Sequence, residues 1–265
     1  EDPRQAAFMV HDRNKRSITL NLKNDEAREA LYKLVKKSDV VVEGFRPGVA
    51  KRLKVDYDTL KAINPRLVYC SITGYGQTGP YASLPGHDIN YISFAGALGL
   101  IGDKDGPPAI PINLVADFGA GGMQAAYGIM VALHARQKTG RGQHVDISLA
   151  DGVMSLLAQQ YSIYQETGKP LRRGEEMLNG GWPHYNVYQC KDGKWISIGS
   201  LEPWLYENTC RALGCEQFVA DAQTGGERRK QVFKAFREVM KTKTRDEWFE
   251  HLAGKEVCVG KVLDI

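Results

Sequence analysis

The chain has 265 residues, which is enough for one large domain or two ordinary ones. Its apolar share of 43% and charged share of 25% are typical of a water-soluble globular protein, and no apolar run reaches the roughly 18 residues that a membrane-spanning helix needs. The net charge of +4 is mild, and the Lys and Arg residues are spread along the chain. This pattern disfavours nucleic-acid binding but suits a small ligand with phosphates.

The cysteines and the chain ends bear on the setting of the protein. The five cysteines are odd in number and lack a C-x-x-C pair, so a reducing compartment is expected, without a disulfide framework or a zinc site. The chain starts without Met and stops after the strand-like residues 256–259, so we expect it to be the middle of a longer protein. The cysteines are Cys70, Cys190, Cys210, Cys215 and Cys258.

The first third of the chain alternates predicted strands and helices. Residues 17–22 alternate in polarity and are rich in β-formers, and Asn24 stands where it would cap the helix that follows. This order with short connections predicts a parallel sheet with helical crossovers. Strands are predicted at residues 17–22, 39–43 and 65–72, and helices at about residues 25–35 and 49–63.

Two loops follow the carboxyl ends of these strands, where ligands bind in parallel sheets. One covers residues 43–48. The other, residues 74–80, holds three glycines but lacks a strand–GxGxxG–helix pattern, and Pro80 interrupts it. The pattern of residues 74–80 therefore predicts a lid or a substrate-binding loop and disfavours a dinucleotide-binding site.

Residues 85–96 combine a Pro-Gly break with a histidine and a small-residue apolar segment. The break places His87 at a loop-to-helix junction. An imidazole can transfer protons near neutral pH, although a single histidine in such a place is more often structural. The longest predicted helix, residues 118–136, then opens with the almost side-chain-free residues 119–122. Close packing against a neighbour or approach of a ligand would each explain these glycines.

The second half predicts one more strand, a helix and then a smaller unit. Residues 145–149 read as a strand, and Asp151-Gly152 opens a helix. A hairpin is expected at residues 185–188 and 195–199, and helices at residues 204–213, 228–240 and 244–252. We therefore predict an α/β fold: a Rossmann-like large domain at residues 1–167, a polar linker at 168–184, and a small α+β domain at 185–265.

Four ionisable residues stand at predicted loops or helix starts: His87, Asp117, Asp151 and Glu202. Acid/base enzymes place such groups where they face a cleft. Each aspartate could instead be an ordinary helix N-cap, and Glu202-Pro203 also looks like a helix start. The glycines around all four favour a site.

Several segments resemble a known family. PGHDINY (85–91), NLVADFGAGGM (113–123) and GSLEPWLY (199–206) resemble the three active-site segments of the α-methylacyl-CoA racemases. GFRPGVAKRL (44–53), SITGYGQTGPYA (71–82) and KTGRGQHVDISLADG (138–152) are similar to segments shared across the family III CoA-transferase (CaiB/BaiF) superfamily. The chain is thus identified as a racemase-like member of that superfamily, and the resemblance covers essentially its whole length.

The resemblance implies roles for the four ionisable residues. His87 and Asp117 would be bases on opposite faces of the substrate α-carbon, and Glu202 would orient His87. The first turn after Asp117, with unpaired N–H groups, is our hypothesis for the donor to the enolate oxygen. Asp151 keeps an alternative open, because transferases of this superfamily use an aspartate there as the nucleophile that carries the acyl group. A CoA-binding protein without activity is the third alternative.

The resemblance also implies an acyl-CoA substrate, no metal, no cofactor beyond the CoA moiety, and neither a nucleic acid nor a membrane as partner. Family members form interlocked homodimers, so Glu202 would act on the His87 of the other chain. The location would be cytoplasmic in a bacterium, and mitochondrial or peroxisomal in a eukaryote.

The resemblance implies a set of CoA contacts as well. Arg13 and Arg52 would meet the CoA phosphates, or would be ordinary solvated charges. The full set of expected CoA-ester contacts is Arg13, Leu20, Asn21, Leu22, Lys23, Arg52, Gly86, Asp88, Ile89, Asn90, Tyr91 and Tyr185, with Leu20–Lys23 as a strand at the adenine and Tyr185 either near the acyl chain or simply packed.

Overall fold

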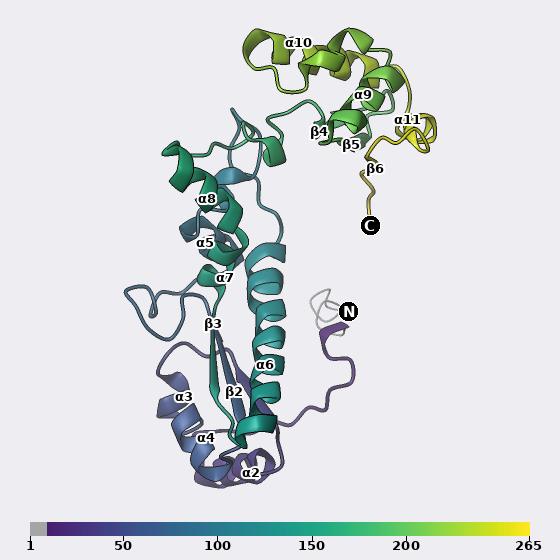
Figure 1. The fold of residues 1–265 in the computed structure, drawn as a ribbon. Coiled ribbons are helices and arrows are strands. Elements are labelled where there is room, and N and C mark those ends of the chain that lie inside the picture. Colours follow the sequence, from purple (N-terminus) through teal and green to yellow (C-terminus); the bar gives the residue numbers. More distant parts are fainter. Residues whose placement is uncertain (1–9) are drawn as a thin grey trace. The chain divides into compact units, whose positions relative to one another are not determined.

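The computed structural model describes residues 10–265, shown in Figure 1. The chain separates into two compact units, each made of two stretches of sequence. Of the described residues, the first unit contains residues 10–87 and Ala116–Gly152. The second contains Asp88–Val115 and Val153–Ile265.

The first unit is built on a parallel sheet, as the sequence predicts. Its strands are β1 (Val40–Glu43), β2 (Val68–Thr73) and β3 (His144–Ser148), in the order β1-β2-β3. Both pairings are parallel. The central strand β2 is buried along nearly its whole length, which explains its apolar sequence.

Helices α2 (Asp25–Val35) and α4 (Tyr57–Ile63) pack together beside the sheet. Their core contains Val35, Leu60, Leu67 and Tyr69, each at most 1% exposed. The Tyr69 hydroxyl donates to the carbonyl oxygen of Val55 at 2.9 Å, so this buried phenol has a partner.

Helix α6 (Gln124–Thr139) runs alongside β2 and β3, as Figure 1 shows. It approaches β3 closely at Gly128, where a Cβ atom would lie 2.9 Å from Val145 Cγ1. The helix ends at Gly140, whose φ of 72° is the left-handed conformation that glycine adopts at helix ends.

The predicted strand at residues 17–22 is wrong. The backbone there is irregular and enters a turn, in which Asn24 N donates to Asn21 O at 2.9 Å and Lys23 N donates to Asn21 Oδ1 at 3.2 Å. Asparagine favours such turns because its side chain competes for backbone groups. Asn24 does occupy the N-cap position of α2, but its side chain makes no capping hydrogen bond.

The single helix predicted at residues 49–63 is also wrong. The structure has a short helix α3 (Val49–Arg52) and then α4, separated by a break at Lys54. Lys54 has a φ of 58°, which no helix continues through. Asp56 then starts α4 and accepts a hydrogen bond from Thr59 Oγ1 at 2.7 Å.

The longest helix begins earlier than the sequence predicts. A π-helical segment, η2 (Leu114–Met123), precedes α6 without a break. Asp117 therefore lies within a helical segment and does not cap one. The hypothesis that the first turn after Asp117 donates to the enolate oxygen is wrong for the same reason. Residues 119–122 lie inside a helical segment and are not the first turn of a helix, where N–H groups lack a partner in the helix.

The second unit contains α5 (Asp88–Phe94), the short η1 (Leu98–Leu100), α8 (Ala158–Thr167) and η3 (Met177–Asn179). The Tyr161 hydroxyl donates to the carbonyl oxygen of Ala95 at 3.0 Å. Arg173 fastens the stretch before η3 to residues 99–106, since its guanidinium donates to the carbonyl oxygens of Gly99, Asp103 and Gly106.

The rest of the second unit is an antiparallel sheet covered by helices, and the predicted hairpin is confirmed. Its core contains Tyr188, Ile196, Tyr206, Phe236 and Trp248, all at most 2% exposed. The elements are β4 (Tyr185–Gln189), β5 (Trp195–Gly199), α9 (Pro203–Ala212), η4 (Glu216–Asp221), α10 (Gly226–Met240), α11 (Arg245–Leu252) and β6 (Val259–Lys261), with the strand order β4-β5-β6.

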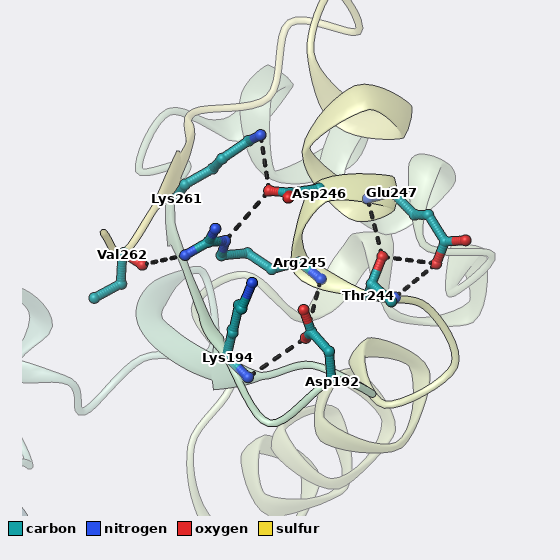
Figure 2. Close-up of polar contacts among 8 residues, drawn as sticks. All are labelled: Asp192, Lys194, Thr244, Arg245, Asp246, Glu247, Lys261 and Val262. Atoms are coloured by element: carbon teal, nitrogen blue, oxygen red, sulfur yellow. Dashed lines mark hydrogen bonds and ion pairs between the residues drawn. The ribbon is translucent and has the colours of Figure 1, made fainter. Parts of the chain in front are cut away.

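A polar network joins β6 to the start of α11 (Figure 2). Arg245 is 8% exposed; its guanidinium donates to Val262 O at 2.7 Å and meets Asp246 at 3.3 Å. Lys261 reaches the same Asp246 carboxylate at 2.8 Å. Thr244 and Glu247 form a capping box ahead of the helix. The buried guanidinium is thus paired, which its burial requires.

Candidate functional site

The carboxyl ends of the three parallel strands lie at one edge of the sheet. The glycine loop after β2 is anchored there at two points. Gln77 N donates to Asp146 Oδ2 at 3.1 Å, and Ala150 N donates to Gly74 O at 3.0 Å. Gly76 has a φ of 79°, so a glycine is needed for this path. The loop therefore meets the start of the helix that carries Asp151.

Asp151 lies in the first turn of α7 (Leu149–Leu156) and is exposed. Its amide donates to Ser148 Oγ at 3.2 Å, so Ser148 supplies the side-chain cap and Asp151 does not. The N-terminal end of a helix stabilises negative charge. This position suits an ionised carboxylate that faces solvent.

The start of α7 packs closely against η2 and the first residue of α6. A Cβ atom on Gly152 would lie 2.7 Å from Ala120 Cβ, and one on Gly121 would lie 3.3 Å from Leu149 Cγ. Gln124 Nε2 also donates to Gly152 O at 3.4 Å. Close packing thus accounts for glycines at this crossing, and it brings together the two helical segments that carry Asp117 and Asp151.

His87 and Asp117 both belong to the first unit. His87 is exposed and directly precedes α5, which confirms the predicted loop-to-helix junction. Asp117 is half-buried within η2. Their roles as bases stay predictions.

Glu202 belongs to the second unit, as the N-cap residue of α9. Its backbone is extended, with φ −71° and ψ 145°, and Pro203 follows as the first helical residue. This confirms the predicted helix start. The Glu202 side chain is exposed and makes no capping hydrogen bond with its own helix. Its proposed action on His87 stays a prediction.

The residues expected to contact CoA lie in several places. Arg13 is exposed in a turn, and Arg52 is exposed at the end of α3. Leu20, Asn21, Leu22 and Lys23 form the irregular segment described above, so any contact with adenine would come from a loop and not a strand. Gly86 precedes α5, whose first turn contains Asp88, Ile89, Asn90 and Tyr91, and half-buried Tyr185 begins β4.

Two histidines escaped the sequence analysis because nothing in their local sequence marks them. His144 Nε2 lies 3.0 Å from Ser71 Oγ, and its ring stacks on Tyr57. His184 is 2% exposed, and no described residue hydrogen-bonds its Nδ1. Burial lowers the pKa of His184, and the positive charge of Arg229 lowers it further.

In residues 10–265, no three His, Cys, Asp or Glu side chains gather as ligands for a metal ion. None of the described helices is long and apolar enough to cross a membrane.

Comparisons with known proteins agree with the fold and the motifs. Human α-methylacyl-CoA racemase is 37% identical over 251 residues, which are 95% of this chain and 66% of the human protein. The acetyl-CoA:oxalate CoA-transferase of Acetobacter aceti is 36% identical over 216 residues, covering 81% of this chain and 54% of that enzyme. The crystal structure of a CAIB/BAIF family protein from Brucella suis matches with a TM-score of 0.78 and 32% identity, covering 94% of this chain and 67% of that one. The chain thus spans no more than about two thirds of the length of these relatives. The sequence profile of CoA-transferase family III matches residues 1–265, and the chain belongs to that family.

Proposed function

We propose that the protein is a racemase that interconverts (2R)- and (2S)-2-methylacyl-CoA esters. The observation that carries the proposal is the pair His87 and Asp117, in segments that resemble the racemase active site. The racemase relative is aligned along 95% of this chain, against 81% for the oxalate CoA-transferase. One is an imidazole and the other a carboxylate. Two different groups can serve here, because each acts on its own face of the α-carbon.

The proposed reaction moves one proton off the α-carbon and another onto it. The thioester makes the α-proton acidic, so a base on one face removes it and leaves an enolate. The second group, on the other face, is protonated at this point and donates its proton to the enolate carbon, which inverts the carbon. Two fixed groups achieve this with small displacements, whereas a single base would have to cross the substrate. His87 and Asp117 exchange protonation states in each turnover and are reset by solvent.

We assign the CoA moiety to the expected set that includes Arg13, Arg52 and Leu20–Lys23. Both guanidinium groups are exposed, so they are accessible to phosphates. No further cofactor and no metal enter the proposed reaction, which is a proton transfer in both directions.

The test uses the complete protein and a (2R)-2-methylacyl-CoA in deuterium oxide. Deuterium uptake at the α-carbon without an added acid is the expected result, followed by appearance of the 2S epimer. Transfer of CoA to an added carboxylate, without α-exchange, would contradict the racemase proposal and identify the protein as a CoA-transferase. Binding of the ester without either reaction would favour a CoA-binding protein that has lost activity.

A CoA-transferase is the second candidate, and Asp151 is the reason. This carboxylate is exposed in the first turn of α7, beside the anchored glycine loop. In a transferase it would attack the thioester carbonyl, expel CoA as the thiolate and hold the acyl group as a mixed anhydride. Hydroxylamine would trap that acyl group, so formation of a hydroxamate would favour this candidate.

A further inference from the structure

Ser200 lies at the junction of three elements in the second unit. It is 0% exposed and stands between β5 and α9. Its amide donates to the carbonyl oxygen of His184 at 2.8 Å, just ahead of β4. Its hydroxyl oxygen accepts from Cys258 N at 3.3 Å, just ahead of β6. The amide and the side chain of Ser200 thus each bond to a backbone stretch that is distant from the other in the sequence.

The Ser200 hydroxyl is also bonded to α9. Thr209 Oγ1 lies 2.8 Å from Ser200 Oγ, and Thr209 is likewise 0% exposed. Thr209 Oγ1 further donates to Leu205 O at 2.7 Å, on the preceding turn. A hydroxyl group both donates and accepts, so the two side chains form a short chain from the loop into the helix. Since the pair is fully buried, breaking it would leave polar groups without water.

These contacts end two residues before Glu202. Leu201 N donates to Gly199 O at 3.2 Å, and Glu202 O accepts the first helical bond, from Tyr206 N at 3.0 Å. The Glu202 backbone is thus held from both sides, while its exposed carboxylate makes no cap within α9. The residues preferred at the N-cap position, Ser, Thr, Asp and Asn, accept a hydrogen bond from a backbone N–H group of the first helical turn. Here the buried hydroxyl pair lies next to the helix start, and the exposed Glu202 carboxylate makes no cap.

We propose that Ser200, together with Thr209, is a positioning residue that fixes the segment carrying Glu202. The inference rests on the proposed racemase function only for its consequence in catalysis. There, Glu202 orients His87, so a looser Glu202 should impair proton transfer on the His87 face alone. Contacts behind a catalytic group hold it in its productive geometry.

The test uses two variants, Ser200→Ala and Thr209→Val. Each removes one hydroxyl group and so breaks the hydrogen bond between the two side chains, and Thr209→Val nearly preserves the shape of its side chain. Ser197→Ala is the matched control, because Ser197 on β5 donates to Gly260 O at 3.2 Å without touching the Glu202 segment. In the full-length protein, amide hydrogen exchange of residues 201–206 should rise about five- to tenfold in both test variants, as expected for loss of about one hydrogen bond. It should not change there in the control.

The second readout is deuterium uptake from each pure epimer. Both test variants should lose about tenfold for the epimer that depends on His87, with an unchanged KM and little loss for the other epimer. In a Glu202→Gln background, Ser200→Ala should add nothing further. Unchanged amide exchange in both test variants would overturn the proposal, as would equal losses for the two epimers. If the parent protein exchanges neither epimer, the racemase proposal fails, and amide exchange still decides whether Ser200 holds this segment.

Discussion

The proposed acid/base pair joins two side chains in different local structures. His87 is exposed ahead of α5, whereas Asp117 is half-buried inside η2. Their residue types and the glycines around them were visible in the sequence. The π-helical setting of Asp117 was not, because a helix of small apolar residues has the same pattern whether its turns are α or π. π-Helical turns often occur at functional sites, which agrees with the proposed role.

The first prediction separates the two faces of the substrate. His87→Ala should suppress proton removal from one epimer far more than from the other, and Asp117→Ala should show the reverse preference. Racemisation should fall about 10²–10⁴-fold in both variants, as is typical for the loss of a general acid or base. The measurement is deuterium uptake from each pure epimer before turnover mixes them. Equal losses for both epimers in both variants would rule out two separate bases.

A second prediction concerns Asp151. Asp151→Ala should leave much of the α-exchange intact, because the racemase reaction does not use this carboxylate. Asp151→Asn is the matched control, since it keeps the shape at the start of α7 and removes only the charge. Complete loss of exchange in a folded variant, together with a hydroxamate in the parent, would instead identify the nucleophile of a transferase.

The third prediction is an acid sensitivity of the second unit that arises at His184. This ring contacts Trp182 and Tyr206, and its folded pKa lies below the ordinary value of 6.5 because of burial and Arg229. Since the unfolded state binds the proton more readily, stability is fully present above about pH 6.5 and is lost as the pH falls toward the lowered folded pKa.

His184→Phe should remove this dependence while filling the same aromatic space. At pH 7 the variant should unfold within about 1 kcal/mol of the parent, because no described residue hydrogen-bonds the lost Nδ1. Urea unfolding at pH 7 and pH 5 measures both effects, and His134→Gln on the exposed face of α6 is the control. A parent whose loss of stability between the two pH values matches that of His184→Phe would contradict the assignment to His184.

At the level of elements, the sequence predicted most of the order and little of the detail. The apolar run of β1, the buried β2 and the hairpin β4–β5 follow directly from their residue patterns. The break at Lys54 could not be predicted, since a left-handed lysine carries no sequence signal. Residues 17–22 alternate like a strand, but the turn at Asn21 decides their backbone. The proposed domain boundary at residues 168–184 stays a prediction.

The fourth prediction tests the helix crossing at Gly152. Gly152→Ala should destabilise the protein by about 1–3 kcal/mol, because its new Cβ would lie 2.7 Å from Ala120 Cβ and 2.8 Å from Ala120 O. Gly99→Ala is the control, with nothing within 4 Å of the added atom. Ala120→Gly should recover part of the loss, since it removes one of the three opposing atoms, the others being Ala120 O and Gln124 Oε1. Thermal unfolding gives the comparison, and a neutral Gly152→Ala would refute close packing here.

The molecule as a whole leaves large apolar side chains exposed in both units. On α6 these include Tyr127 and Met130, which are 73% and 65% exposed. In the second unit, Ile110 and Ile112 are 63% and 69% exposed. Where such side chains form a contiguous patch, they mark a surface that binds a partner. We propose that the partner is a second copy, as the family resemblance implies.

The last prediction follows from the interlocked arrangement of that proposed dimer. If Glu202 of one chain orients His87 of the other, a dimer of one His87→Ala chain and one Glu202→Ala chain holds one intact site and one site with both defects. Co-expression of the two variants should therefore recover activity that neither variant has alone, whereas mixing the folded variants should recover none. If both residues act within one chain, every site in the mixed dimer keeps a defect. The measurement is conversion of one pure epimer into the other, in mixed dimers purified through two different affinity tags. Co-expression of His87→Ala with Asp117→Ala is the control, because both bases come from the same unit of the same chain. That mixed dimer holds one defective base at each site, so neither site should convert one epimer into the other, although each should still exchange the α-proton of one epimer. Recovery in the first pair and not in the second would place Glu202 opposite the His87 of its partner chain.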